Sequence, residues 1–544
     1  MEMMNLSLPA TNKFASSYLE QSAEILPFFH YRYNQLSDYK NRLKELENRT
    51  FPRKELGEHI ESYMSRFPSS PAVKSSLEKL KQENSAVIIG GQQAGILTGP
   101  LYTIHKVISI IKMAEQKETE LGIPVVPVFW IAGEDHDYQE VNHVFVPVGQ
   151  KADKWVYPER VLQKRMVSDI AIDEEICLSW AQNLIKNFGE TDHTNSILEM
   201  LEDALKKSES FTDFFATVIM EFYKDYGLLI IDSGNPDVRK IEKEFFEKQI
   251  NHHDSITVSL LEQQQEISKK GFSLTLEATE NAANIFYYDP MLQERILLEY
   301  DRTQDRFIGK NGVLSFSKEE LLRVLADSPE RLSNNVVTRP LMQDFLFPTL
   351  GFIAGPGEIA YWAELKKVFE HFGIKMPPII PRINITLLDR SVETDIEEME
   401  LELAEVLQFG TSIKKDAFLE SIKDKEVEEL FTAARDQLTR QYLLIEEKTG
   451  QLDKGLLPLL KKNQDLLIKQ ISFMEGRLEK SVKMQHETVL EKFSRIDLAL
   501  RPEGSPQERI WNIFWFINKY GLDFVHSLME LSYEFDGNHK VIKL

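Results

Sequence analysis

Residues 86–106 read AVIIGGQQAGILTGPLYTIHK, and this stretch is the strongest indication of the fold. Its apolar start predicts a buried strand, and Pro100 can open a helix directly after the last glycine. Glycines between a strand and a helix let backbone N–H groups approach an anion, helped by the helix N-terminus. The stretch is neither a Walker A loop nor a clean dinucleotide fingerprint. It therefore predicts a ligand-binding turn or, as the alternative, a tight connection without a ligand.

Four later segments repeat this order of apolar strand, turn and helix. They are PVVPVFWIAG from Pro124, GLLIIDSG from Gly227, FPTLGFIAGPG from Phe347 and PPIIPRINI from Pro377. Strands that are apolar throughout are typical of parallel sheets covered on both faces. We predict an α/β fold with a doubly wound parallel sheet in residues 1–390. Two insertions interrupt it, a mainly helical one at about 151–226 and one with hairpin strands at about 255–335.

After residue 390 the sequence changes to charged helical segments with an apolar seam. Apolar residues recur in steps of three, four or seven within 392–496, which is typical of a coiled coil. Two glycines and a proline within 450–458 predict the turn between two antiparallel helices. We expect 391–498 to form a coiled-coil domain that makes a homodimer, and 499–544 to pack back on the core. Alternatively, these helices cover the protein's own sheet.

The composition excludes several classes of protein. The 544 residues include 86 acidic and 64 basic ones, a net charge of -22, so nucleic acid and anionic membranes are not expected partners. No apolar run reaches the roughly 20 residues of a membrane span. The single cysteine, Cys177, and a start without signal-peptide features favour the cytoplasm.

The second strand is followed by the most reactive stretch of the chain, FWIAGEDHDYQEVNH from Phe129. Asp135, His136 and Asp137 are the predicted catalytic residues, because carboxylates beside a histidine tune each other's pKa for acid–base work. They fall where open α/β sheets bind ligands. No metal is expected, since no known ligand spacing is present. The alternative is a solvated acidic turn.

Polar residues at the other strand ends complete a predicted substrate crevice. Lysine and arginine in this set could hold a carboxylate or phosphate, although each could equally form a structural ion pair. The predicted substrate-binding residues are Gln92, Gln93, Thr98, Gly99, Lys106, Asn142, Asp232, Ser233, Arg339, Gly355, Glu358, Tyr361 and Arg382.

Five motifs in order resemble one family along nearly the whole chain. They are GGQQAGILTGPLYTIHK, FWIAGEDHDYQEVNH, LIIDSGNPDVRK, TRP…FIAGPGEIAYW and LRPEGSPQER. The chain is similar to the cysteine-adding enzymes (cysteine ligases) of bacillithiol biosynthesis. This resemblance implies a Rossmann-like core related to class I aminoacyl-tRNA synthetases, two connecting-peptide insertions and a coiled-coil homodimer. It also implies the last step of bacillithiol synthesis, in which L-cysteine is added to the amine of glucosaminyl-malate.

The chain departs from class I synthetases in the signatures that handle ATP. It has no HxGH and no KMSKS motif, so the use of ATP or ADP is left open. A nucleotide site away from the crevice is predicted near Leu500–Arg509. Arg501 and Arg509 supply charge there and Ser505 can cap the next helix, although a rigid return from the coiled coil to the core is the alternative.

Three function classes follow from these observations. The favoured one is an amide-forming ligase acting on small molecules. A non-catalytic coiled-coil dimer, with a degenerate synthetase fold used as a scaffold or binding module, is the structural alternative, but it does not need the polar strand ends. A true aminoacyl-tRNA synthetase conflicts with the charge and the missing motifs.

Overall fold

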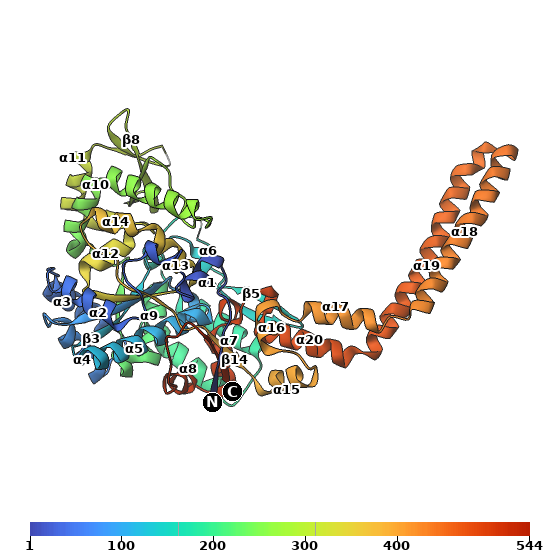
Figure 1. Cartoon of the computed structure of the whole chain (residues 1–544), viewed down its shortest axis with the longest axis horizontal. Helices are drawn as coiled ribbons and strands as arrows, with labels where there is room; N and C mark the ends of the chain where they lie inside the picture. The colour runs from blue at the N-terminus through green and yellow to red at the C-terminus, as the bar shows by residue number, and fades with distance from the viewer. Residues whose placement is uncertain (162, 311) are drawn as a thin grey trace. The chain divides into compact units, whose positions relative to one another are not determined.

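The computed structural model describes residues 1–161, 163–310 and 312–544. These residues form two compact units, an α/β unit of 1–388 with 507–544 and a helical unit of 389–506 (Figure 1). Within the described ranges, no helix is both long and apolar enough to cross a membrane.

The central sheet of the α/β unit confirms the predicted parallel sheet. Its order is β13-β12-β2-β3-β6, and every neighbouring pair is parallel. The strands are β2 (Ala86–Gln92), β3 (Val125–Ile131), β6 (Leu229–Asp232), β12 (Thr349–Ala354) and β13 (Ile379–Pro381). The chain starts in the middle, moves outward through β3 and β6, and returns to the other side of β2. The direction in which the chain adds strands to the sheet therefore reverses between β2 and β12, as in Rossmann-like folds.

Helices join and cover these strands. Before β2 the chain forms one short strand and four α-helices. The connecting helices are α5 (Leu101–Leu121) after β2, α13 (Pro356–Glu364) and α14 (Lys366–His371) after β12, and α12 (Arg339–Leu346) before it. The N-terminal helices are α1 (Lys13–Leu19), α2 (Leu36–Leu46), α3 (Arg53–Met64) and α4 (Pro71–Leu80).

The segment between β3 and β6 is helical with one hairpin that the sequence did not indicate. The helices are α6 (Tyr138–Val141), α7 (Glu174–Phe188), α8 (Thr194–Leu205) and α9 (Phe211–Tyr223). The hairpin joins β4 (His143–Val148) to β5 (Lys151–Val156). β5 is mostly exposed and polar, so it lacks the apolar run that marks a buried strand.

The segment between β6 and β12 holds a second, antiparallel sheet of order β10-β9-β8-β7-β11. Its strands are β7 (Ala282–Asp289), β8 (Glu294–Asp301), β9 (Arg306–Gly309), β10 (Ser315–Phe316) and β11 (Leu332–Asn334). The 34-residue α10 (Pro236–Lys269) continues well past residue 255, where the second insertion was expected to begin. α11 (Lys318–Asp327) opens with a capping box of Ser317 and Glu320.

A third sheet joins the two ends of the chain and was not predicted. In it β15 (His539–Lys543) lies between β1 (Glu2–Leu6) and β14 (Ile385–Leu388), and the termini are neighbours in Figure 1. The single strand expected from Pro377 is therefore wrong, because its residues form β13 and β14 in different sheets. Between β14 and β15 the α/β unit also contains α21 (Gln507–Ile510), α22 (Ile513–Tyr520) and α23 (Phe524–Met529).

The helical unit consists of six helices, two of which form a long hairpin (Figure 1). They are α15 (Arg390–Glu398), α16 (Leu403–Phe409), α17 (Ser412–Ser421), α18 (Lys425–Leu452), α19 (Leu457–Gln485) and α20 (Glu487–Leu500). Arg435 bonds Glu475 and Tyr442 bonds Asn463, so α18 and α19 run antiparallel. The apolar spacing that begins at residue 392 does not belong to one continuous helix, because the chain breaks between α15 and α16 at Glu400, whose φ is 51°.

Candidate active site

The candidate site lies at the carboxyl ends of β2 and β12, between which the order of strand addition reverses. Open α/β sheets bind ligands at this switch point, because the loops on either side diverge there. β2 ends in Gly91 and Gln92, and β12 is followed by Gly355 at the start of α13. The structure therefore brings together the turns of two predicted glycine-rich motifs.

Lys106 reaches across the switch point from α5. Its Nζ donates to the carbonyl of Gly91 at 2.7 Å and to Gln92 Oε1 at 3.3 Å. It also pairs with Glu358 Oε2 at 2.6 Å. Burial lowers the pKa of Lys106, while the Glu358 carboxylate opposes that shift. The charge of Lys106 is thus paired with that of Glu358 inside the protein, and Lys106 holds the two turns together.

Glu358 uses only one of its two carboxylate oxygens for the hydrogen bonds that the described residues make to it. Its Oε2 accepts from both Lys106 Nζ and the backbone N–H of Gly355, at 2.6 and 2.7 Å. Among the described residues, every hydrogen bond to this carboxylate falls on Oε2, and the side chain is 23% exposed. A substrate ammonium group could therefore bind Oε1 without disturbing the Lys106 pair.

Glu134, at the end of β3, lies beneath the site in a group of arginines. Its carboxylate is fully buried and bonds Arg339 Nε at 2.9 Å and Arg239 Nη2 at 2.5 Å. Burial alone would raise the pKa of Glu134, but the surrounding guanidinium groups hold it below its ordinary value. Arg239 also pairs with the buried Glu242 at 2.6 Å. Glu134 therefore fixes Arg339 in place.

Asp135 is paired rather than free. Its Oδ1 lies 2.5 Å from Arg339 Nη2 and 3.5 Å from Arg295 Nη1. Arg295 comes from β8 in the second insertion, stacks 3.8 Å from the ring centroid of Phe286 and donates to Ser333 Oγ at 2.9 Å. Sequence reasoning missed Arg295, because one arginine in an apolar hairpin strand gives no indication of where its side chain ends.

His136 and Asp137 lie at the exposed side of this arginine group. His136 Nδ1 is 3.4 Å from Arg295 Nη1, and a guanidinium only donates, so the imidazole proton belongs on Nε2. His136 Nε2 is 4.0 Å from Asp137 Oδ1. Burial and Arg295 lower the pKa of His136 against the pull of its two aspartate neighbours. His136 is therefore neutral at pH 7, and Asp137, with 56% of its side chain exposed, is the accessible carboxylate.

Tyr361 is close enough to Glu358 and Arg339 for both charges to act on its hydroxyl. Burial raises its pKa, the Glu358 carboxylate adds to that shift and the Arg339 guanidinium opposes it. Tyr361 therefore lies within electrostatic reach of both sides of the crevice.

Two other predicted residues, Asp232 and Arg382, are taken up by internal contacts, whereas the buried Ser233 hydroxyl has no hydrogen-bond partner among the described residues. Asp232 accepts from Ser168 Oγ and the backbone N–H of Gly234, both at 2.8 Å, and burial raises its pKa to about 6. Ser233 is fully buried beside it. Arg382 pairs with Glu508 at 2.6 Å. Arg382 thus forms a structural ion pair, the alternative that the sequence left open for the arginines.

The remaining crevice residues lie on the loops. Gln93 Nε2 donates to Glu140 Oε2 at 3.2 Å, and the carbonyl of Asn142 accepts from Tyr157 N at 2.8 Å. Thr98 and Gly99 belong to the turn after β2, where φ is 72° and 70°.

The three residues predicted to bind a nucleotide do not form a ready phosphate site. Arg501 donates to the carbonyls of Leu407 and Gly504, at 3.1 and 2.5 Å. Arg509 is exposed on the four-residue α21, and Ser505 is half-buried. Arg501 thus uses two nitrogens on backbone oxygens and would have to exchange them for phosphate.

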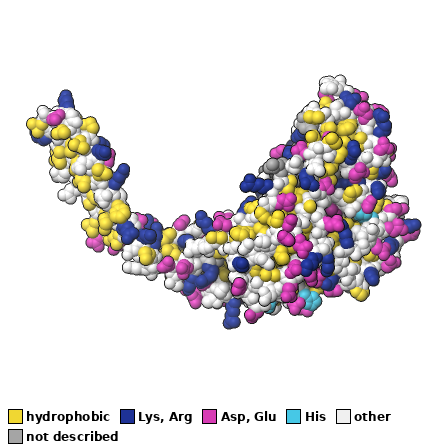
Figure 2. Space-filling model, turned by 180° about the vertical axis from the view of Figure 1, so that it is seen from behind, with side chains coloured by type: hydrophobic (Ala, Val, Ile, Leu, Met, Phe, Trp, Pro, Cys, Tyr) yellow, Lys and Arg dark blue, Asp and Glu magenta, His cyan; other side chains and the backbone are white. Residues whose placement is uncertain are grey.

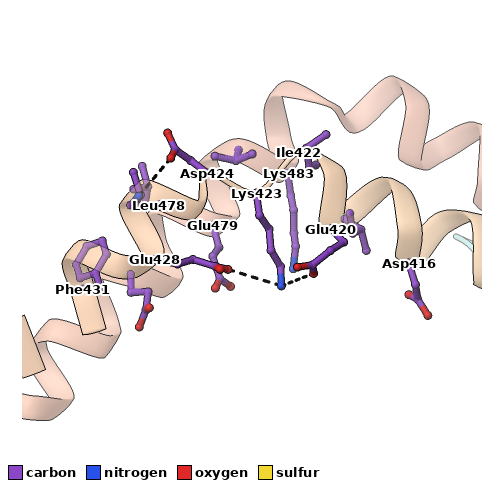
Figure 3. Close-up of a pocket in the computed structure, with 14 residues that line it drawn as sticks. Asp416, Glu420, Ile422, Lys423, Asp424, Glu428, Phe431, Leu478, Glu479 and Lys483 are labelled. Atoms are coloured by element: carbon purple, nitrogen blue, oxygen red, sulfur yellow. Dashed lines mark hydrogen bonds and ion pairs between the residues drawn. The ribbon is translucent and has the colours of Figure 1, made fainter. Parts of the chain in front are cut away.

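Two further features lie outside the crevice. Cys177 is buried in α7, and burial raises the pKa of its thiol to about 12, so it is no nucleophile. A hollow of about 350 Å³ lies within the helical unit between α17, α18 and α19, where Lys423 reaches Glu420 and Glu428 beside Ile422 and Leu478 (Figure 3). Among the described residues, no group of three metal-ligating side chains occurs.

The sheet order, the polar switch point and the helical hairpin define a class: a Rossmann-like α/β protein with a coiled-coil domain. Residues 1–383 match the family model described as bacillithiol biosynthesis BshC, N-terminal Rossmann-like domain. Residues 385–544 match the C-terminal coiled-coil domain of the same family. The chain therefore belongs to the BshC family of bacillithiol biosynthesis, which confirms the resemblance seen in its motifs.

Relatives match over their full length. A protein of Geobacillus sp. (strain WCH70) named "Putative cysteine ligase BshC" is 43% identical over 542 residues, covering 100% of both chains. A protein of the same name from Anoxybacillus flavithermus is 40% identical over 544 residues, again covering 100% of both.

Proposed function

We propose that the protein is a cysteine ligase that joins the carboxyl group of L-cysteine to the amine of glucosaminyl-malate, the last step of bacillithiol synthesis. The observation that carries this proposal is the family match along the whole chain, with relatives named as cysteine ligases. The polar residues at the ends of β2, β3 and β12 support a catalytic crevice rather than the scaffold alternative.

The amine must lose its proton before its nitrogen can attack the cysteine carboxyl carbon. We assign this proton transfer to Asp137, because Asp135 already bonds two arginines and His136 Nδ1 faces Arg295. His136 Nε2 lies 4.0 Å from Asp137 Oδ1, so the imidazole would have to move closer before it could donate to the Asp137 carboxylate and orient it.

Two groups are suited to hold the charged ends of the substrates. Glu358 Oε1 suits an ammonium group, since the opposite oxygen is anchored by Lys106 and Gly355. Arg339 bonds carboxylates through Nε and Nη2, so Nη1 is the nitrogen that suits a substrate carboxylate. Gln92 and Gln93 supply neutral donors and acceptors nearby.

A carboxylate does not condense with an amine unaided in water, so the carboxyl oxygen must leave as part of a better leaving group. ATP would supply that activation, and ADP would be a product if a phosphoryl group is transferred. We assign no step to ATP, because HxGH and KMSKS are absent and Arg501 is occupied by carbonyls. A relation to class I aminoacyl-tRNA synthetases, with the two insertions as connecting peptides, is part of the same proposal.

We further propose a homodimer formed through α18 and α19 in the cytoplasm. Large apolar side chains are exposed on this hairpin, which shows hydrophobic patches in Figure 2; they include Leu430, Leu443, Leu459, Phe473 and Met474. A second hairpin would remove them from water. The single buried cysteine suits a reducing compartment.

The test supplies L-cysteine, glucosaminyl-malate and ATP to purified variants and follows the ligated thiol by mass spectrometry. His136→Ala and Asp137→Asn should reduce product formation by about 100-fold or more, the usual effect of losing acid–base groups. The controls are His143→Ala, which removes a nearby histidine, and Asp153→Asn on the exposed strand β5. Near-normal product from both site variants would remove this motif from the chemistry, and wild-type protein that makes no product would favour the scaffold.

A further inference from the structure

The turn after β2 has a backbone conformation that needs external support. Leu97, Thr98 and Gly99 have φ values of 50°, 72° and 70° in succession. Residues other than glycine avoid this left-handed region, because their Cβ approaches the following carbonyl oxygen. The turn also folds tightly on itself, since a Cβ added to Gly95 would lie 2.7 Å from the Cα of Gly99. Some other part of the chain must hold this turn closed.

Asn512, far away in the sequence, supplies that support. Its side chain is buried, and Nδ2 donates to the carbonyls of Leu97 and Gly99 at 2.7 and 2.6 Å. Its Oδ1 accepts from Phe514 N at 2.8 Å and thereby caps α22. The neighbouring carbonyl of Trp511 accepts from Leu101 N, the first residue of α5, at 2.8 Å. One asparagine therefore satisfies the turn and a helix end at once.

The segment that carries Asn512 is itself firmly attached to the core. The Gln507 side-chain amide bonds both the N–H and the carbonyl of Leu387, each at 2.8 Å. Glu508 pairs with Arg382 and lies 3.1 Å from His105 Nδ1 on α5. Residues 507–512 thus contact both the turn and α5, where His105 directly precedes Lys106.

We propose that Asn512 is a positioning residue that holds the turn after β2 in its substrate-binding conformation. This inference rests on the proposed ligase function for the meaning of the turn, but the contact itself does not depend on it. The turn carries Gln93 and Thr98, and Thr98 Oγ1 is buried with no hydrogen-bond partner among the described residues. Only a side chain with two amide protons and an acceptor, at this length, can make the three bonds of Asn512.

The full-length variant Asn512→Ser tests the contact, because serine keeps a helix-capping oxygen but loses both amide protons. Asn518→Ser is the matched control. Asn518 is also buried on α22, but it donates to Gly189 O at 2.8 Å, in a different loop. Hydrogen exchange of the amides from Gly95 to Leu101 should be about tenfold faster in the first variant and unchanged in the second. Equal exchange in both variants overturns the proposal.

Kinetics then distinguish positioning from general stability. With cysteine, the amino sugar and ATP supplied, Asn512→Ser should lower kcat/KM about tenfold or more, mainly through KM, while Asn518→Ser keeps wild-type values. Equal kcat/KM in the two variants overturns the positioning role, even if exchange differs. Should wild-type protein form no product, the proposed function fails, and hydrogen exchange alone still decides whether Asn512 holds the turn.

Discussion

Replacing Glu358 by glutamine should destabilise the α/β unit by about 2 kcal/mol. Lys106 is only 2% exposed, and removing one partner of a buried ion pair typically costs about 3–5 kcal/mol. Two features reduce that cost here: Glu358 is 23% exposed, and a glutamine oxygen still accepts from Lys106 Nζ. Lys106→Met should cost less, about 1 kcal/mol, because the remaining carboxylate keeps water and the N–H of Gly355.

The two variants should also differ in their pH dependence. The folded protein holds the pKa of Lys106 below that of a free lysine, chiefly by burial. Between those two pKa values the unfolded chain binds more protons, so stability rises as the pH increases towards about 10.4. Loss of the Glu358 charge lowers the folded pKa further, so the rise should begin at lower pH in Glu358→Gln. Lys106→Met should show no such rise from this site.

Urea denaturation followed by tryptophan fluorescence measures both effects. All six tryptophans lie in the α/β unit, so the signal reports that unit alone; they are Trp130, Trp155, Trp180, Trp362, Trp511 and Trp515. Equal losses in the two variants, or the same pH profile for both, would refute the assignment of a buried ion pair to Lys106 and Glu358.

Three other predictions concern separate parts of the chain. Glu508→Gln should lower the free energy of unfolding at pH 7 and make it depend less on pH in acid. Although burial alone would raise the pKa of Glu508, Arg382 and His105 hold it far below its ordinary value, so the stabilisation by Glu508 is lost as the pH falls below about 4.3. An acid profile in urea denaturation that is the same as for wild type contradicts this prediction. Replacing residues 425–485 by a short glycine–serine linker should give a monomer with wild-type tryptophan fluorescence, and a dimer in light scattering contradicts the proposed hairpin interface. If Arg501 exchanges its two backbone carbonyls for a phosphate, Arg501→Ala should weaken ADP and ATP binding about tenfold in calorimetry, while unchanged affinity moves the nucleotide to the crevice.

The central sheet was predictable because each strand carries its own signal. Strands such as AVIIGG and GLLIIDSG are apolar throughout, and each ends in glycine or a helix-starting residue, so short stretches determine both boundaries. The third sheet was not predictable in this way. β1 and β15 are short strands, and β1 is partly exposed, so its partner depends on chain segments more than 500 residues apart.

The candidate site shows the same division. The sequence predicts Asp135, His136 and Asp137 as catalytic residues because they follow a strand directly, and it left open whether arginines would bind substrate or protein carboxylates. It could not identify Arg295 or Asn512, whose roles depend on packing between segments that are remote in the sequence. Local patterns indicate which residues are polar at a strand end, whereas only the folded chain decides which of them remain available.

The position of β15 has a consequence for how a ribosome produces this protein. β15 is the middle strand of its sheet, yet it is translated after both neighbours and after the whole of the helical unit. During synthesis the edges of β1 and β14 that pair with β15 therefore remain unpaired, and unpaired strand edges can pair with strands of other chains. Asn512 also emerges after the long hairpin has been made. The nascent chain can thus acquire its central sheet early, while the turn at the switch point closes only after the hairpin has been translated.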